Sequence, residues 1–212
     1  MTLFFKPTFL ELQMPSLMPN LFKRLPLASL LCLALGCGVI EESEAAAPPK
    51  AEIKTNLGSF VIELYPDKAP KTVANFIQYV DEGFYAGTTF HRVIPNFMVQ
   101  GGGHLANLDR KPTRAPIEIE SRNGLKNDAG WVAMARTSSP NSASSQFFIN
   151  VVNNDGLNHP NPDGHGYTVF GKVVSGMDVV EKIRKSPTGS SGGMRDVPTT
   201  AIVIESAKML KP

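Results

Sequence analysis

Short runs of alternating hydrophobic and polar residues, broken by Gly, Pro and Asn, dominate the chain after residue 50. This period of two is typical of β-strands that bury one face. Eight runs fit the pattern: AEIKTN (51–56), GSFVIELY (58–65), TTFHRVI (88–94), FMVQGG (97–102), WVAMAR (131–136), QFFINVV (146–152), YTVFGKVV (167–174) and AIVIESAKML (201–210). Leu57 and Gly58 join the first two runs, which predicts a hairpin.

Two segments, 71–84 and 175–185, carry hydrophobic residues at helical spacing instead. Their hydrophobic faces would consist of Val73, Phe76, Ile77 and Val80 in the first and Met177, Val180 and Ile183 in the second. A closed barrel leaves no edge strand exposed, so eight strands fit closure better than an open sheet. We therefore expect a mainly β fold: a closed eight-stranded antiparallel barrel capped by two α-helices.

The first 36 residues have the features of an export signal. Lys23 and Arg24 precede the apolar run LPLASLLCLALGC (25–37), which is too short for an ordinary transmembrane helix. Translation from Met14 or Met18 would give a signal of ordinary length, and both starts stay open.

The tetrapeptide ALGC (34–37) resembles the bacterial lipobox, in which the signal is removed and the new N-terminal cysteine is lipidated. We therefore expect lipidation at Cys37, with a plain signal or a short buried helix as the alternatives. Residues 37–50 would be the lipidated cysteine and a flexible tether, because they are acidic and then rich in Ala and Pro. Residues 51–212 have the length of one domain.

Charge argues against nucleic acid as a partner. Residues 1–36 contain Lys6, Lys23, Arg24 and Glu11, so their removal leaves 18 of the 21 basic and 18 of the 19 acidic residues. A net charge of zero gives no electrostatic attraction to phosphates. The two cysteines are Cys32, inside the signal, and Cys37, so the mature domain has no disulfide.

Two glycine-rich stretches match nucleotide or hydrolase motifs only formally. GGGHLA (101–106) fits a dinucleotide fingerprint, but the polar, proline-containing NLDRKPTRAP behind it is not an apolar helix. GSSGG (189–193) fits the G-x-S-x-G pattern, but no strand precedes it to form a nucleophile elbow. We read 189–193 as a flexible loop.

The loop NNDGLNHPNPDGHG (153–166) invites a metal interpretation, because it contains Asp155, His159, Asp163 and His165. Calcium loops need a closing glutamate, and the two histidines lack a third ligand at useful spacing. Turn formation explains the Asn, Pro, Asp and Gly content, so we expect no metal.

The segment FHRVIPNFMVQGG (90–102) places an arginine inside an otherwise apolar strand. Alternation puts Phe90, Arg92 and Ile94 on one face and His91 and Val93 on the other. An isolated arginine there would be a solvated edge residue. Nearby Gln100, however, has an amide that can fix a guanidinium in place.

Three long segments resemble the signature blocks of the cyclophilin family of peptidyl-prolyl cis/trans isomerases. Within that family, they resemble the bacterial periplasmic members. They are FHRVIPNFMVQGG (90–102), MARTSSPNSASSQFFIN (134–150) and YTVFGKVVSGMDVVEKI (167–183), in family order. The resemblance covers about 50–210. It implies the eight-stranded barrel with two capping helices and an enzyme without cofactor or metal.

The resemblance also implies roles for ten residues. Arg92 and Gln100 would be catalytic, with Arg92 donating to the prolyl nitrogen and Gln100 steadying Arg92 and contacting the substrate backbone. The substrate-binding residues would be Phe97, Met98, Phe148 and Leu157 in the proline pocket, Gln146 beside them, Tyr167, and the backbone groups of Ala135 and Arg136. Phe147 should turn inward by alternation.

The chain departs from the family pattern where many relatives carry Trp or Phe before the pocket leucine. It has Gly156 before Leu157. The pocket rim should therefore be wider and less apolar, and cyclosporin, the cyclic peptide inhibitor of the family, should bind weakly. Tyr167 stands where many relatives have histidine, and this substitution is common in bacterial members.

We therefore expect an isomerase that accelerates X-Pro isomerisation during the folding of exported proteins. Its partners would be unfolded or partly folded polypeptides that contain proline, and it would act as a monomer. It would lie in the periplasm. A lipid anchor at Cys37, inserted in the outer membrane, would be its only membrane contact. The alternatives are a chaperone that binds proline segments without turnover and a structural envelope lipoprotein.

Overall fold

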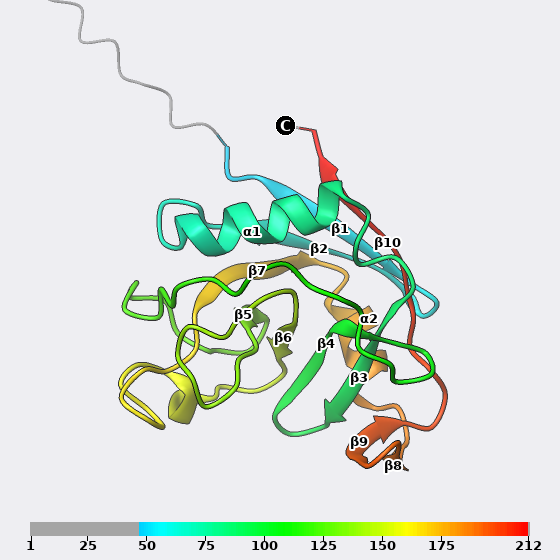
Figure 1. The fold of residues 1–212 in the computed structure, drawn as a ribbon. Coiled ribbons are helices and arrows are strands. Elements are labelled where there is room, and N and C mark those ends of the chain that lie inside the picture. Colours follow the sequence, from blue (N-terminus) through cyan, green and yellow to red (C-terminus); the bar gives the residue numbers. More distant parts are fainter. Residues whose placement is uncertain (1–46, 212) are drawn as a thin grey trace, which may run out of the picture. The chain divides into compact units, whose positions relative to one another are not determined.

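The computed structural model describes residues 47–211 (Figure 1). The expected signal at 1–36, the lipidated Cys37 and most of the 37–50 tether lie outside these residues. The helices are α1 (Pro70–Asp81), α2 (Met177–Arg184) and the short 3-10 helix η1 (Asp155–Leu157). The strands are β1 (Lys50–Thr55), β2 (Gly58–Leu64), β3 (Thr88–Ile94), β4 (Met98–Leu105), β5 (Trp131–Met134), β6 (Phe147–Asn150), β7 (Val169–Ser175), β8 (Thr188–Ser191), β9 (Met194–Pro198) and β10 (Ile204–Leu210).

Eight strands form one antiparallel sheet in the order β10-β1-β2-β7-β5-β6-β4-β3. The sheet curls into a half-barrel (Figure 1) whose edges are β10 and β3. An isolated bridge between Thr89 and Val203 links these edges, and Phe90 N donates to Ile202 O at 2.9 Å. Closure of the barrel is not confirmed, because this pairing stays local and does not continue as a ladder along β10.

The main hydrophobic core lies between the curled sheet and the two helices. On α1, the expected face is confirmed by buried Val73, Phe76 and Val80, and the Phe76 ring packs 5.7 Å, between ring centroids, from Phe147. Val180 and Ile183 bury α2 against the same core, with Met177 partly buried. Hydrophobic burial at these positions fixes both helices on the sheet.

A distant carboxylate caps the N-terminus of α1. Ala69 offers no side-chain cap and Pro70 has no N–H to donate. Glu120 instead accepts hydrogen bonds from the backbone N–H groups of Lys71 (3.0 Å) and Thr72 (2.8 Å) and from Thr72 Oγ1 (2.7 Å). The negative charge also matches the positive end of the helix dipole. Glu120 therefore ties the long β4–β5 connection to α1.

The segment expected to be a flexible loop at 189–193 is part of a β-hairpin. β8 and β9 pair antiparallel around Gly192 and Gly193, whose φ angles of 56° and 78° suit a tight hairpin turn. The loop interpretation was wrong because β8 is exposed along its length and shows no hydrophobic alternation. β9 packs beside β3, at the edge of the sheet that carries Arg92.

Strand β3 does not keep the simple alternation expected from its sequence. The pairing with β4 shifts register on both sides of Phe90. Phe90 and Val93 both lie in the main core, whereas Arg92 points to the other side of the sheet. The expectation that Phe90 shares a face with Arg92 was therefore wrong, because a bulge reverses the side-chain direction between them.

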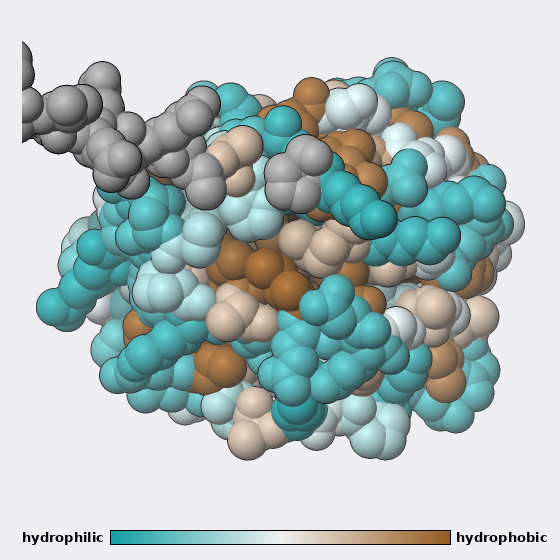
Figure 2. Space-filling model, turned by 90° about the horizontal axis from the view of Figure 1, so that it is seen from above, coloured by the Kyte–Doolittle hydropathy of each residue, from teal (hydrophilic) through white to brown (hydrophobic). Residues whose placement is uncertain are grey.

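The surface on the side of α1 is mostly hydrophilic. Figure 2 looks onto this side and shows hydrophobic residues gathered near its middle, between hydrophilic ones. Within residues 47–211, Val174 and Leu210 are the large hydrophobic residues with exposed side chains. No helix in the described part of the chain has the length and hydrophobicity needed to cross a membrane.

Candidate active site

A pocket of about 100 Å³ lies on the outer side of the curled sheet. Its lining includes nine of the ten site residues expected from the sequence: Arg92, Phe97, Met98, Gln100, Ala135, Arg136, Phe148, Leu157 and Tyr167. The structure therefore gathers residues that are up to 75 positions apart, from Arg92 to Tyr167, around one small cavity.

Neighbouring strands supply the floor of the pocket. Met98 lies at the start of β4 and Phe148 lies in β6, where it pairs with Gln100 on one side and Ala133 of β5 on the other. Met98, Ala133 and Phe148 are buried in a hydrophobic cluster separate from the main core. Phe147 is fully buried in the main core, which confirms the expectation that it turns inward.

Arg92 stands at the edge of the pocket with its side chain partly in solvent. Its side chain is 40% exposed, and Nε lies 3.8 Å from Oδ2 of Asp196 on β9. Asp196 has a φ of 60°, in the left-handed region that few residues other than glycine adopt. The β8–β9 hairpin thus brings a carboxylate next to Arg92, which sequence reasoning missed because 189–193 was read as a loop.

Gln146 is the one expected site residue that does not line the pocket, and it lies directly beside it. Gln100, which pairs with Arg92 in the β3–β4 register, donates from Nε2 to Gln146 Oε1 at 2.9 Å. A Cβ at Gly103 would lie 2.3 Å from Cγ of Gln146. Glycine at 103 is therefore what lets Gln146 occupy this place.

Gln146 belongs to an adjoining polar cavity of about 220 Å³. Its lining is Gln100, Arg110, Ala135, Arg136, Thr137, Ser142, Ser144 and Gln146. Gln100, Ala135 and Arg136 also line the first pocket, so these three residues border both cavities.

Asparagine side chains hold two of the pocket residues in place. Asn154 Nδ2 donates to the backbone carbonyl of Phe97 at 2.8 Å and to Oδ1 of Asn150 at 2.7 Å. Asn127 Nδ2 donates to the carbonyl of Leu157 at 3.2 Å, and its Oδ1 accepts from Asn150 at 3.2 Å. The signal for this network was Asn150 at the end of an apolar strand, because a buried amide needs partners.

Gly156, directly before the pocket residue Leu157, has open space around it. A Cβ added there would meet no atom within 4 Å. The next residue, Leu157, is only partly buried where it packs on the Met98 and Phe148 cluster. The position therefore has room for a larger side chain.

Two histidines lie buried close behind Arg92, outside the pocket. The rings of His91 and His104 are 4.1 Å apart between centroids, and Nδ1 of each has no hydrogen-bond partner among residues 47–211. Burial, helped by the neighbouring His104, lowers the pKa of His91 from 6.5 to about 4. Burial and the charge of Arg110 also lower the pKa of His104. Burial therefore disfavours the protonated form of both rings.

The glycine-rich segment 101–103 lies within strand β4. Gly101, Gly102 and Gly103 continue strand β4 and do not open a helix, so the dinucleotide interpretation is excluded. Within the described residues, no three His, Cys, Asp or Glu side chains come together as metal ligands.

Comparisons with known proteins point to one family. Residues 50–209 match the family described as cyclophilin type peptidyl-prolyl cis-trans isomerase/CLD. A peptidyl-prolyl cis-trans isomerase of Acinetobacter baylyi is 51% identical over 179 residues, covering 84% of this chain and 94% of that protein. Peptidyl-prolyl cis-trans isomerase B of Escherichia coli is 54% identical over 154 residues, covering 72% of this chain and 94% of that protein.

Solved structures agree with these matches. A cyclophilin-type isomerase of Cryptosporidium parvum, crystallised in the presence of the dipeptide Ala-Pro, is 28% identical with a TM-score of 0.63. The match covers 77% of this chain and 99% of that one. A cyclophilin of Hirschia baltica is 26% identical with a TM-score of 0.61, over 77% of this chain and 75% of that one.

Proposed function

Because the chain belongs to the family of cyclophilin-type peptidyl-prolyl cis-trans isomerases, we propose that its small apolar pocket binds the proline ring of the substrate and that Arg92 assists rotation of the X-Pro bond. The chain is a peptidyl-prolyl cis-trans isomerase, the activity for which its relatives are named. The observation that carries the residue assignment is the single cavity that joins the Phe97, Met98 and Phe148 side chains to Arg92.

The reaction requires no nucleophile and no metal. Rotation about the peptide bond has a barrier of about 18–20 kcal/mol because the nitrogen lone pair is delocalised into the carbonyl. In the twisted state the lone pair returns to nitrogen, which becomes a hydrogen-bond acceptor. A site that grips the ring and offers a donor to this nitrogen therefore lowers the barrier.

Arg92 suits the donor role. Its guanidinium stays charged at all working pH values and presents several N–H groups in a fixed plane. A bond to the prolyl nitrogen gains strength only as resonance is lost, so it stabilises the transition state more than either isomer. Loss of isomerisation after replacement of Arg92 is the result that tests this assignment.

The substrate chain would lie extended across Gln100, Ala135 and Arg136, which border both cavities. Ala135 N already donates to Gln146 O at 3.0 Å, so we expect the peptide to use the Ala135 carbonyl and the Arg136 N–H. Gln100 would contact the peptide backbone, with its amide oriented by Gln146. Tyr167 closes the pocket edge-on to Phe148, with ring centroids 5.7 Å apart.

Filling the open rim should strengthen binding of cyclic peptide inhibitors. In Gly156→Trp the new ring has room beside Leu157, and an aromatic contact of about 1.4 kcal/mol corresponds to about tenfold tighter binding of cyclosporin. Isothermal titration of the two proteins measures the difference, with Gly156→Ser as a control that adds little apolar surface. Equal affinity for the wild type and Gly156→Trp would mean that residue 156 lies away from the bound ligand.

The cellular role belongs to the same proposal. The basic and apolar order of residues 23–37, ending in ALGC, supports export, lipidation at Cys37 and a periplasmic site on the outer membrane. The enzyme would act there as a monomer on proline-containing, incompletely folded polypeptides. A stable anchor requires more than one acyl chain.

Lipidation has a direct test. Cells that express the full chain and are fed labelled palmitate should give a labelled, membrane-bound protein, whereas Cys37→Ala should give none. Cys32→Ala is the matched control, because it removes the other cysteine inside the same apolar run. Label that persists in Cys37→Ala would contradict lipidation at this residue.

A further inference from the structure

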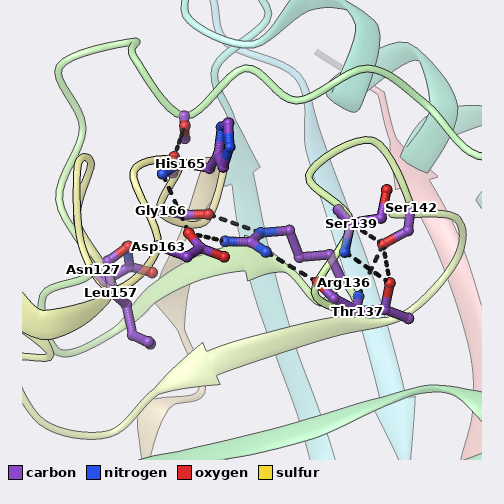
Figure 3. Close-up of polar contacts among 10 residues, drawn as sticks. Asn127, Arg136, Thr137, Ser139, Ser142, Leu157, Asp163, His165 and Gly166 are labelled. Atoms are coloured by element: carbon purple, nitrogen blue, oxygen red, sulfur yellow. Dashed lines mark hydrogen bonds and ion pairs between the residues drawn. The ribbon is translucent and has the colours of Figure 1, made fainter.

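The Arg136 side chain is almost fully buried and binds three different backbone or side-chain oxygens. It is 3% exposed, and its Nη2 donates to Oδ1 of Asp163 at 2.8 Å. Nε donates to the carbonyl of Gly166 at 2.9 Å and Nη1 to the carbonyl of Thr137 at 2.9 Å. Figure 3 shows Arg136 reaching between the loop of Asp163 and Gly166 and the loop of Thr137, Ser139 and Ser142. One guanidinium therefore joins two loops.

The first of these loops begins and ends at the substrate pocket. Residues 158–166 follow Leu157 and precede Tyr167, and both of these line the cavity. The Arg136 guanidinium also lies over the Tyr167 ring, with Cζ 4.5 Å from the centroid, and Tyr167 meets Phe148 edge-on. A shift of the guanidinium would therefore be passed to the pocket wall through Tyr167.

Asp163 is the one partner of this guanidinium that carries a charge. A buried guanidinium without a counter-charge is costly, so loss of the carboxylate would favour movement of Arg136 towards water. Asp163 is 36% exposed, which leaves it reachable from outside without a place in the pocket lining. The hydrogen bond from Arg136 lowers the pKa of Asp163, consistent with an ionised carboxylate.

We propose that Asp163 is a positioning residue that sets substrate affinity by locking Arg136 against Tyr167 and the 158–166 loop. This inference rests on the proposed function, since it takes the cavity beside Tyr167 as the substrate pocket. Preorganisation of the wall reduces the ordering that the substrate must cause on binding.

The test compares steady-state isomerisation of a short Ala-Pro peptide by wild type, Asp163→Ala and Asp163→Asn. We expect Asp163→Ala to raise KM three- to tenfold. It should leave kcat within about twofold, because Arg92 lies on β3, at the opposite side of the pocket from Tyr167. Asp163→Asn keeps the size and one acceptor oxygen and removes the charge, so its KM should lie between the two. It also carries the test if Asp163→Ala fails to fold.

The matched control is Asp178→Ala, which breaks an exposed ion pair to Lys182 on α2 (3.4 Å) and lines neither cavity. Its KM should equal that of the wild type. An unchanged KM in folded Asp163→Ala, or a fall in kcat at constant KM, would overturn the positioning role while the wild-type activity stands. An inactive wild type would count against the pocket assignment itself.

Discussion

Replacing Arg92 by alanine should lower kcat/KM for a short Ala-Pro peptide by about 100-fold or more, with the fold and the apolar pocket kept. Removal of one donor that acts on developing transition-state charge costs about 2.7–4 kcal/mol in other enzymes, which corresponds to about 10²–10³ in rate. The side chain is 40% exposed and lies outside both hydrophobic clusters, so its loss should not destabilise the domain.

Two further variants separate the donor geometry from the charge. Arg92→Lys keeps the charge but loses the planar group, and it should recover little activity. Arg195→Ala removes an exposed arginine from the same hairpin that carries Asp196, and it should behave as the wild type. Isomerisation followed by exchange NMR measures all three variants. Activity of Arg92→Ala within a few-fold of the wild type would show that the barrier is lowered by binding alone.

Mild acid should destabilise the domain through the buried histidine pair. The pKa of His91 is about 4 in the folded protein and about 6.5 in the unfolded chain, so the unfolded state binds more protons between these values. Well above pH 6.5 the histidine is neutral in both states and contributes no pH dependence to stability. As pH falls from 6.5 to 4, the free energy of unfolding should decrease by up to about 3 kcal/mol, most of it before the folded ring titrates.

Several charges near the pair act in the same direction. Arg92 and Arg110 both disfavour protonation of His91, and the neighbouring His104 does so as well. Urea unfolding at pH 7, 6 and 5 measures the loss, with His91→Gln as the comparison because glutamine does not titrate. The variant should lose less stability than the wild type over this range. Parallel curves for the two proteins would place the acid sensitivity elsewhere.

The sequence was most informative where burial produced a simple pattern. The alternation of β6 correctly predicted that Phe147 faces the main core, where it meets Phe76, and that Phe148 faces the pocket. The prediction held because an uninterrupted strand keeps successive side chains on opposite faces. The helical spacing of α1 and α2 likewise located their buried sides. Resemblance to the family supplied what periodicity could not, namely which residues from separate strands meet in one cavity.

The errors arose where backbone irregularity or exposure removed that pattern. A register shift beside Phe90 placed it in the core, and no property of the FHRV letters signals an extra residue in a strand. Strand β8 is exposed along its whole length, so its pairing with β9 left no hydrophobic alternation in the sequence of β8. The sequence did not reveal Asp163 and Asp196 as partners of arginines for a related reason. Ion pairs between residues far apart in the chain depend on the tertiary placement of loops, which leaves no local pattern.

The pairing of β1 with β10 determines when the sheet can be completed. Lys50 pairs with Leu210 and Thr55 with Ile204, so the outer neighbour of the first strand is the last strand of the chain. During synthesis from the N-terminus, β1 keeps one edge of unpaired backbone groups until residues 204–210 are available. The domain therefore stays unfinished until residues 204–210 have been made, and before that point the outer edge of β1 is open to other pairing partners.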